Sequence, residues 1–120
     1  MKDSISIILP AYNEENSIEE AVNVVTDVVS KETKDYEIII INDGSTDTTG
    51  KIANRIAVSN KKVKVIHHKN NEGFGITFRD GLEIASKQYI TGFPADNDLL
   101  RETFEDIVTA RKNDCIAITY

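Results

Sequence analysis

The stretch Ile38-Ile-Ile-Ile-Asn-Asp-Gly-Ser-Thr-Asp47 passes from a wholly apolar segment into small and polar residues. Four consecutive isoleucines favour a strand that is buried on both faces, which is typical of parallel sheets. The residues from Asn42 to Asp47 carry carboxylates, hydroxyls and a glycine, which favour a turn and a helix start. The stretch therefore predicts a buried strand whose carboxyl end opens onto a polar edge.

Strand-like and helix-like segments alternate on both sides of this stretch. The expected strands are short apolar runs bounded by turn residues. They are Ile5–Leu9, Tyr36–Ile41, Val63–Ile66, Tyr89–Phe93 and Cys115–Thr119. This alternation predicts an α/β domain with a mainly parallel sheet, helices on both faces and right-handed crossovers.

The segments between the expected strands carry apolar residues at helical spacing. Ser17-Ile-Glu-Glu20 has the form of a capping box. Ser45 or Thr46 is expected to cap the second helix and Asp98 the fourth, while the third is expected from Ile76 to Lys87. The predicted inward-facing residues, helix by helix, are Ile18, Ala21, Val22, Val25 and Val29; Ile52, Ala53 and Ile56; Phe78, Leu82 and Ala85; Leu100, Phe104, Ile107 and Val108.

Composition restricts the class of protein. With 120 residues, 40% hydrophobic and 28% charged, the chain fits one soluble globular domain over residues 1–120. No apolar run has the length of a membrane span, and the N-terminus lacks the features of a signal peptide, so a cytoplasmic location is expected. The formal charge of −6 disfavours a nucleic-acid partner. Cys115 is the single cysteine and is expected to be a buried thiol in a reducing compartment.

Three polar clusters follow expected strands: Pro10-Ala-Tyr-Asn-Glu-Glu15, Asn42-Asp-Gly-Ser-Thr-Asp47 and Pro94-Ala-Asp-Asn-Asp98. Each cluster alone is also compatible with a plain strand-to-helix turn. The carboxyl ends of parallel strands share one edge of the sheet, however, and that edge is where such folds bind ligands. The clusters are therefore expected to form one site.

The residue types in these clusters suit a nucleotide. Tyr12 offers an aromatic face for a base, and Asp43 offers a carboxylate that accepts a hydrogen bond from a base N–H. Asp96 and Asp98 are hard oxygen ligands that suit Mg²⁺ or Mn²⁺, which bind carboxylates together with substrate phosphates. A metal ion would also allow an acidic protein to hold a diphosphate.

Together with Asn71-Glu-Gly-Phe-Gly75, the three clusters resemble, in order and spacing, the motifs of family 2 glycosyltransferases. The resemblance covers nearly the whole chain and implies the Rossmann-like, nucleotide-binding half of the GT-A fold. Within the family, Asn71–Gly75 followed by Phe78-Arg-Asp-Gly-Leu82 is most similar to the polyprenyl-phosphate hexose synthases.

The resemblance implies metal-assisted transfer of a sugar, with inversion, from a UDP- or GDP-linked donor to a lipid-phosphate or glycan acceptor. A lipid acceptor would place the protein peripherally at the inner face of the membrane. The implied metal ligands for Mg²⁺ or Mn²⁺ are Asp96 and Asp98, and the Gly73–Gly75 turn would support the nucleotide or sugar. The implied nucleotide-binding residues are Pro10, Ala11, Tyr12, Glu14, Asp43, Arg79 and Asp96.

The chain departs from the family pattern in three respects. The family often has two acids where this chain has Asn42-Asp43, so Asp43 is expected to carry the role. The usual Asp-Ala-Asp metal segment is Pro94-Ala-Asp here, and Asp98 is expected to substitute for the missing acid. Family members continue past the fifth strand, so the general base is expected beyond residue 120, supplied by more of the chain, a second copy in a homo-oligomer, or another protein.

Two alternative interpretations remain open on these residues. A non-catalytic nucleotide-sugar-binding module would use the same side chains without turnover. A signalling receiver domain has a similar length but needs an acid after the third strand, where this chain has His67-His-Lys-Asn70.

Several further features have plainer interpretations. The two histidines, His67 and His68, are expected to occupy a surface or strand-end position, because further metal ligands are not evident. Lys61, Lys62 and Lys64 are expected in a solvated loop. Gly44 and Gly81 are expected to serve a turn and helix packing. The absence of Gly-x-Gly-x-x-Gly and Walker motifs disfavours dinucleotide and P-loop chemistry.

Overall fold

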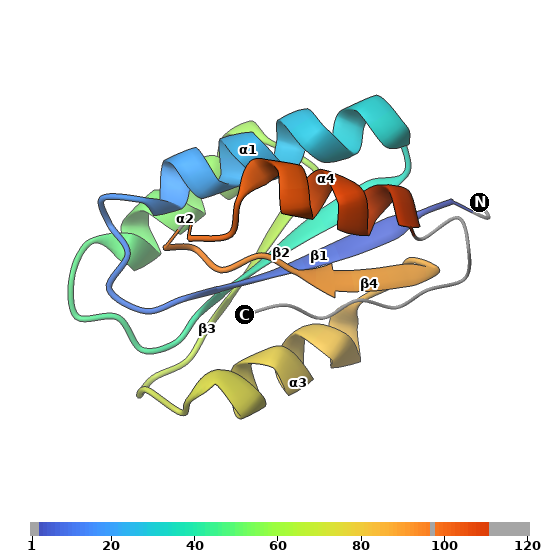
Figure 1. The fold of residues 1–120 in the computed structure, drawn as a ribbon. Helices are drawn as coiled ribbons and strands as arrows, with labels where there is room; N and C mark the ends of the chain where they lie inside the picture. The colour runs from blue at the N-terminus through green and yellow to red at the C-terminus, as the bar shows by residue number, and fades with distance from the viewer. Residues whose placement is uncertain (1–2, 97, 111–120) are drawn as a thin grey trace.

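The computed structural model describes residues 3–96 and 98–110. Strands and helices alternate along this part of the chain, as predicted (Figure 1). Their bounds are β1 Ile5–Ala11, α1 Ile18–Glu32, β2 Tyr36–Asn42, α2 Thr49–Ser59, β3 Val63–His67, α3 Phe74–Ile84, β4 Tyr89–Gly92 and α4 Arg101–Ala110. The predicted strand Cys115–Thr119, with Cys115 itself, lies outside the described residues.

The described strands form one sheet in the order β3-β2-β1-β4, and every pairing in it is parallel. The register places Ile8 opposite Ile39 on one side and Gly92 on the other. The ladder continues past β4, because the N–H of Phe93 donates to the carbonyl of Ile8 at 2.9 Å. The predicted parallel α/β architecture is confirmed.

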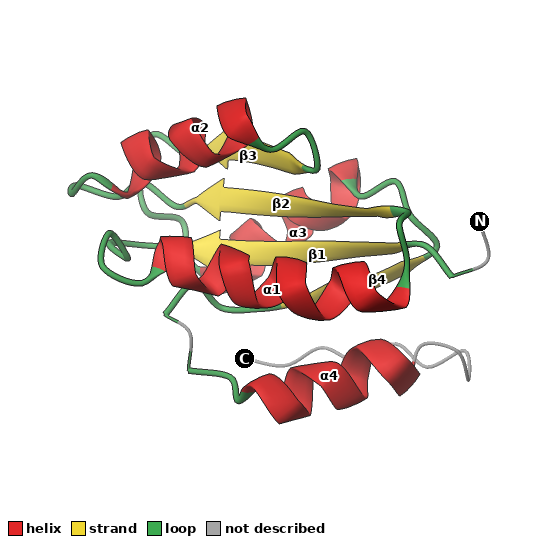
Figure 2. Ribbon diagram, turned by 90° about the horizontal axis from the view of Figure 1, so that it is seen from above, coloured by secondary structure: helices red, strands yellow, loops and turns green. Residues whose placement is uncertain are grey.

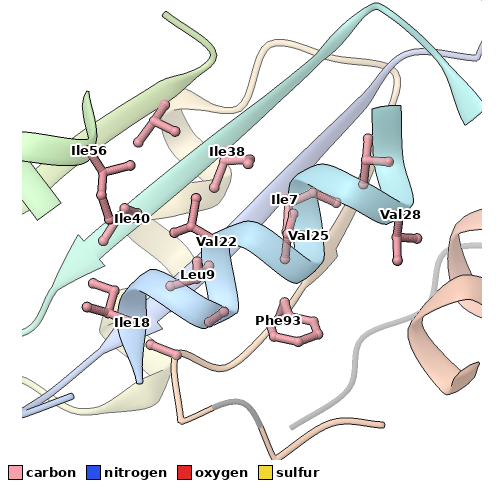
Figure 3. Close-up of a cluster of buried hydrophobic side chains, with 14 of the residues drawn as sticks. Ile7, Leu9, Ile18, Val22, Val25, Val28, Ile38, Ile40, Ile56 and Phe93 are labelled. Atoms are coloured by element: carbon pink, nitrogen blue, oxygen red, sulfur yellow. The ribbon is translucent and has the colours of Figure 1, made fainter. Parts of the chain in front are cut away.

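Helices cover both faces of the sheet (Figure 2). α1, α2 and α4 lie over one face, where Ile38 and Ile40 of β2 join the larger apolar core (Figure 3). α3 lies over the other face, where Ile39 and Ile41 pack with Phe78. All four isoleucines are fully buried, and each such side chain contributes roughly 1.5–3 kcal/mol over an exposed one. The wholly apolar run is thus explained by a strand that has no solvent face.

The starts of α1 and α2 differ in detail from prediction. Ser17 is the N-cap of α1, but its hydroxyl makes no capping bond, so the predicted capping box is wrong. α2 has Thr48 as its N-cap rather than Ser45 or Thr46. The carboxylate of Asp47 accepts the N–H of Thr49 at 2.9 Å and so binds a first-turn donor instead.

α3 begins and ends earlier than predicted. It starts after Gly73, whose φ is 93°, and its buried residues are Thr77, Phe78 and Gly81, whereas Leu82 is 43% exposed rather than inward-facing. The packing role predicted for Gly81 explains the difference, because a Cβ there would lie 2.7 Å from Cγ2 of Ile8. The helix stops at Ile84 because the buried carboxylate of Glu37 accepts the next available N–H, that of Ser86, at 2.7 Å.

α4 packs through Phe104 and Val108, as predicted. The ring of Phe104 meets Phe93 edge to face, with centroids 4.9 Å apart. Leu100 precedes the helix and is 67% exposed, so its predicted inward position is wrong. The carbonyl of Leu100 accepts the N–H of Phe104 in the first turn of the helix. α4 therefore begins at Arg101, and Asp98, the predicted cap, lies before this turn. No helix among the described residues combines the length and the apolar character that crossing a membrane requires.

Candidate functional site

The first two polar clusters are bound to each other at the carboxyl ends of β1 and β2. The side-chain oxygen of Asn13 accepts the N–H of Thr46 at 2.8 Å, and the hydroxyl of Ser45 accepts the N–H of Asn13 at 3.0 Å. The hydroxyl of Thr49 accepts the N–H of Glu14 at 2.8 Å. The polar residues that follow the isoleucine run therefore bind the loop after the neighbouring strand.

The third cluster joins the same edge through its backbone. The N–H of Ala95 donates to the carbonyl of Pro10 at 3.1 Å. The hydroxyl of Ser17 lies 2.7 Å from the carbonyl of Ala95 and 2.8 Å from Oε2 of Glu14. This use of Ser17 explains why it does not cap α1. All three clusters meet at one edge of the sheet, as the parallel topology predicts.

A cavity of about 490 Å³ opens between the clusters and the start of α3. This volume lies within the range of small-ligand sites, roughly 300–1,000 Å³. The residues that line it are Pro10, Ala11, Tyr12, Glu14, Asp43, Asn71, Gly73, Phe74, Thr77, Pro94, Ala95, Asp96, Asp98 and Leu99.

Most of the residues predicted for the site line this cavity. The exception among the predicted nucleotide ligands is Arg79, which is not part of the lining and whose side chain is 61% exposed beside Asp80. Of the turn predicted to support the ligand, Gly73 lines the cavity and Gly75 does not. The structure thus brings Tyr12, Asp43 and Asp96 together, while their roles stay predictions.

Acidic side chains line the cavity from three directions. Glu14 comes from the first cluster, Asp43 from the second, and Asp96 and Asp98 from the third. No lysine, arginine or histidine is among the lining residues in the described part of the chain. The lining side chains of the described residues therefore offer an anionic ligand no cationic partner.

Asp43 is the most enclosed of these acids, with 5% of its surface exposed. Its Oδ1 accepts from Nδ1 of His68 at 2.7 Å and from the N–H of Glu72 at 2.9 Å, and its Oδ2 accepts the N–H of Gly73 at 3.0 Å. Burial alone would raise the pKa of Asp43, but these donors outweigh burial and lower it. A carboxylate has about four lone-pair positions, so one on Oδ2 is not used by the described residues.

Gly44 lets the loop before α3 approach Asp43 closely. Its φ is 72°, which is unfavourable for residues with a Cβ. A Cβ there would also lie 2.4 Å from the carbonyl carbon of Asn70. The predicted turn role of Gly44 is confirmed, and the close approach is what brings Glu72 and Gly73 within reach of the carboxylate.

The predicted metal ligands share one rim of the cavity. The N–H of Asp98 donates to Oδ1 of Asp96 at 3.0 Å, which ties the two residues to each other. Within residues 3–96 and 98–110, no group of three His, Cys, Asp or Glu side chains is placed to hold a metal ion. Two carboxylates fit the way Mg²⁺ and Mn²⁺ bind alongside substrate phosphates, rather than a complete protein cage.

His68 occupies the predicted strand-end position, but it is not a surface residue. It does follow the end of β3, but its side chain is 7% exposed and lies between Asp43 and Asp80. The pairing joins three separate elements, so no local pattern signals it. The cavity-lining residues Asn71, Phe74 and Thr77 were also not singled out, although the first two belong to the Asn71–Gly75 motif.

Comparison with protein families and curated proteins gives a consistent result. The family model of Glycosyl transferase family 2 matches residues 6–119. An uncharacterized glycosyltransferase of Haemophilus influenzae is 36% identical over 113 residues, which are 93% of this chain and 34% of that protein. Glycosyltransferase GlyG of Streptococcus pneumoniae is 30% identical and is matched over 85% of this chain and 33% of its own length. The chain thus spans about a third of the length of these relatives.

Solved structures of glycosyltransferases share the fold. S. aureus TarS 1-349 in complex with UDP-GlcNAc superposes with a TM-score of 0.71 at 25% identity, over 92% of this chain and 31% of that one. The mannosyltransferase PcManGT from Pyrobaculum calidifontis, in complex with GDP-Man and Mn²⁺, superposes with a TM-score of 0.69 at 22% identity, over 87% of this chain and 31% of that one.

Proposed function

The chain belongs to glycosyl transferase family 2, and from that premise we propose that its cavity binds a nucleotide-diphosphate sugar as the donor of a glycosyl transfer. The observation that carries the proposal is the cavity itself. It lies at the carboxyl edge of a parallel sheet. Its lining combines aromatic faces, a buried carboxylate and two exposed acids. A nucleotide diphosphate with a divalent cation matches that combination.

Aromatic side chains provide surfaces for the base. Tyr12 is 45% exposed and Phe74 is 42% exposed, and both line the cavity. Stacking of a base on an aromatic ring contributes roughly 1–3 kcal/mol. Phe74 is itself supported by Phe78, with ring centroids 5.8 Å apart, so it offers a rigid surface.

Asp43 supplies the polar contact to the base. Its remaining lone pair, on Oδ2, accepts one N–H, and uracil and guanine both carry a ring N–H. Because the carboxylate is already held by His68, Glu72 and Gly73, it needs no rearrangement to receive the base. A fixed acceptor of this kind favours a nucleotide over ligands that have no N–H donor.

Asp96 and Asp98 would hold Mg²⁺ or Mn²⁺ together with the diphosphate. The bound metal would supply Lewis-acid stabilisation of the leaving diphosphate. The two carboxylates would orient the cation, and Glu14, which Ser17 links to the carbonyl of Ala95, adds a further negative charge to the cavity lining. Without a cation these acids would repel a diphosphate.

The donor nucleotide is a matter for experiment. The complex of TarS with UDP-GlcNAc supports a UDP-linked donor, and the complex of PcManGT, which shares the fold, makes GDP with Mn²⁺ the second pair to test. Transfer with inversion, a lipid-phosphate or glycan acceptor, and a general base beyond residue 120 complete the proposal as the family resemblance implies them.

Calorimetric titration tests the donor site. UDP and GDP are each titrated into the protein with and without Mn²⁺. We expect saturable, Mn²⁺-dependent binding of one nucleotide. Failure of both nucleotides to bind in the presence of Mn²⁺ would overturn the proposal.

A pair of variants tests the metal ligands. Asp96→Asn should weaken Mn²⁺-dependent nucleotide binding by on the order of a hundredfold, because a neutral amide is a poor ligand for a hard cation. The matched control is Asp106→Asn, which neutralises an exposed acid on α4 away from the cavity and should leave the affinity unchanged. Equal affinities in the two variants would contradict the assignment of Asp96.

A further inference from the structure

His68 lies between two carboxylates that come from different elements. Its Nδ1 is 2.7 Å from Oδ1 of Asp43, at the end of β2, and its Nε2 is 2.6 Å from Oδ2 of Asp80, on α3. A third acid, Glu72, approaches Nδ1 to 3.8 Å. The imidazole is thus enclosed by acceptors at both of its nitrogens.

This arrangement requires the cationic form of His68. An ionised carboxylate only accepts hydrogen bonds, so each ring nitrogen must carry a proton to face one. A neutral imidazole has one N–H and would place a lone pair against one of the two carboxylates. Only the imidazolium satisfies both contacts, and it also offsets one negative charge beneath an acidic cavity.

The adjacent histidine shows what a neutral ring needs. Nδ1 of His67 faces Nδ2 of Asn42 at 3.0 Å, and its Nε2 faces Oδ1 of Asn54 at 2.8 Å. Oδ1 of Asn42 accepts the N–H of Ser45, which orients the Asn42 amide with its donor toward His67. One acceptor and one donor on the ring satisfy both partners, so a neutral tautomer suffices.

The contacts of His68 lead directly to the wall of the cavity. The carboxylate that it holds at Asp43 binds the N–H groups of Glu72 and Gly73. Gly73 is the N-cap of α3, and Phe74 and Thr77 of the first turns line the cavity. Through Asp80, His68 binds the same helix a second time. His68 thus fastens α3 to the end of β2, through Asp80 and through Asp43, next to the residues of α3 that line the cavity.

We propose that protonated His68 is a positioning residue, which holds Asp43 and the start of α3 in the geometry that binds the nucleotide, and whose deprotonation weakens nucleotide binding. The part of this inference that concerns the ligand rests on the proposed function. The part that concerns the cavity wall does not, because it is visible in the protein alone.

Acidic side chains dominate the surroundings of His68. The hydrogen bond that His68 donates to Asp43 raises the pKa of His68, burial lowers it, and Asp80 and Glu72 raise it further, so the pKa lies above its ordinary value of 6.5. A cation, Arg79, lies next to one of these acids: its Nη2 is 3.5 Å from Oδ1 of Asp80. This direction agrees with the protonated form that the two hydrogen bonds require.

The first test is an NMR titration of ¹⁵N-labelled protein from about pH 5.5 to about pH 9.5. His67→Gln assigns the two imidazoles and serves as the matched control. We expect both ring nitrogens of His68 to be protonated at neutral pH, and the amides of Glu72 and Gly73 to shift with the same midpoint as its deprotonation. A neutral His68 at neutral pH would overturn the proposal. So would amide shifts of Glu72 and Gly73 that do not change as His68 titrates.

The second test measures affinity for UDP with Mg²⁺ over the same pH range. We expect the affinity of the wild type to fall by on the order of tenfold as His68 deprotonates, and UDP to raise the midpoint of His68 by linkage. His68→Gln should bind UDP weakly, and its affinity should depend less on pH. The dependence that remains in this variant measures the titration of the UDP phosphates. His67→Gln should follow the wild type. An affinity that is constant through the His68 midpoint would overturn the coupling.

The two tests separate this inference from the proposed function. If the Glu72 and Gly73 amides follow His68 but UDP and GDP do not bind at any pH, the nucleotide proposal fails and the positioning role stands. If a nucleotide binds equally well to wild type and His68→Gln at every pH, the nucleotide proposal stands and the positioning role fails.

Discussion

The two ends of the isoleucine run in β2 each carry a buried acid, and the two acids differ in what surrounds them. Glu37 precedes the run and is 4% exposed, and Asp43 follows it and is 5% exposed. Glu37 accepts hydrogen bonds from Ser6 and Ser86 on Oε2 and from Lys64 on Oε1, and it is not among the residues that line the cavity. Asp43 binds His68 and two backbone N–H groups and faces the cavity with one lone pair left.

Two acids that are buried to a similar extent therefore serve different purposes. The counter-ion of Glu37 is a lysine whose side chain is 52% exposed to solvent. The counter-ion of Asp43 is an enclosed histidine, and its hydrogen bond to Asp43 raises its pKa above the ordinary value of 6.5. The amino end of the strand is therefore a structural junction, whereas the carboxyl end is a junction that also faces a ligand site.

The largest effect is expected for Asp43→Asn. An asparagine has one acceptor oxygen in place of two, so it cannot accept hydrogen bonds from both His68 and Gly73. Its NH₂ group would face one of these two donors. We expect the free energy of unfolding to fall by about 3 kcal/mol and UDP affinity to fall at least tenfold. Urea denaturation and calorimetry measure the two quantities, and a folded variant with wild-type affinity would contradict the role of Asp43.

Glu37→Gln should change stability with no effect on binding. The hydrogen bonds from Lys64, Ser6 and Ser86 outweigh the effect of burial and lower the pKa of Glu37 to about 2, from 4.5. That lowering corresponds to on the order of 3 kcal/mol at neutral pH. We expect a loss of about 2 kcal/mol, because a glutamine keeps part of the hydrogen bonding. If UDP affinity fell as far as in Asp43→Asn, the contrast between the two ends would be wrong.

The pH dependence of stability should separate the two ends. Because the folded-state pKa values of Glu37 and Asp43 are lowered, their contributions are complete above the unfolded values and disappear as the pH falls, for Glu37 from about pH 4.5 toward pH 2. The folded-state pKa of His68 is raised, so its contribution is complete below pH 6.5 and disappears as the pH rises through the folded value. Urea unfolding at a series of pH values should show the alkaline decline vanish in His68→Gln and persist in Glu37→Gln.

The smallest effect is expected for Ser86→Ala. The hydroxyl of Ser86 donates to Oε2 of Glu37 at 3.0 Å, but the backbone N–H of the same residue remains bound at 2.7 Å. We expect a loss of about 1 kcal/mol in the free energy of unfolding. Nucleotide affinity should be unchanged, and a measurable loss of affinity would mean that the amino end of β2 communicates with the cavity.

The sequence was sufficient to predict the order of elements, because apolar periodicity reports directly on strands and helices. It was also sufficient to predict that the three polar clusters share one edge, because that follows from parallel strands alone. The details that it could not predict depend on partners distant in the chain. α3 ends where it does because Glu37 binds Ser86, and its inward face follows Gly81 against Ile8 rather than Leu82.

The same reason explains what was missed at the site. Asp43 was predicted to contact a base, but its hydrogen bonds to the loop after β3 depend on the close approach at Gly44. His68 resembles a surface histidine in sequence, since its partners Asp43 and Asp80 belong to other elements. Local patterns locate the edge of the sheet, whereas the contacts that organise it become visible only in three dimensions.

The most direct test of the account is an amide-resolved NMR titration with UDP and Mg²⁺. Buried carboxylates accept backbone N–H groups at both ends of β2: Asp43 accepts those of Glu72 and Gly73, and Glu37 accepts that of Ser86. The amide signals of these three residues therefore report on the two junctions in the same way. We predict saturable shifts at Glu72 and Gly73 and none at Ser86. Shifts at Ser86 equal to those at Gly73, or no shifts at Glu72 and Gly73 with either UDP or GDP, would contradict a nucleotide site at the carboxyl edge of the sheet.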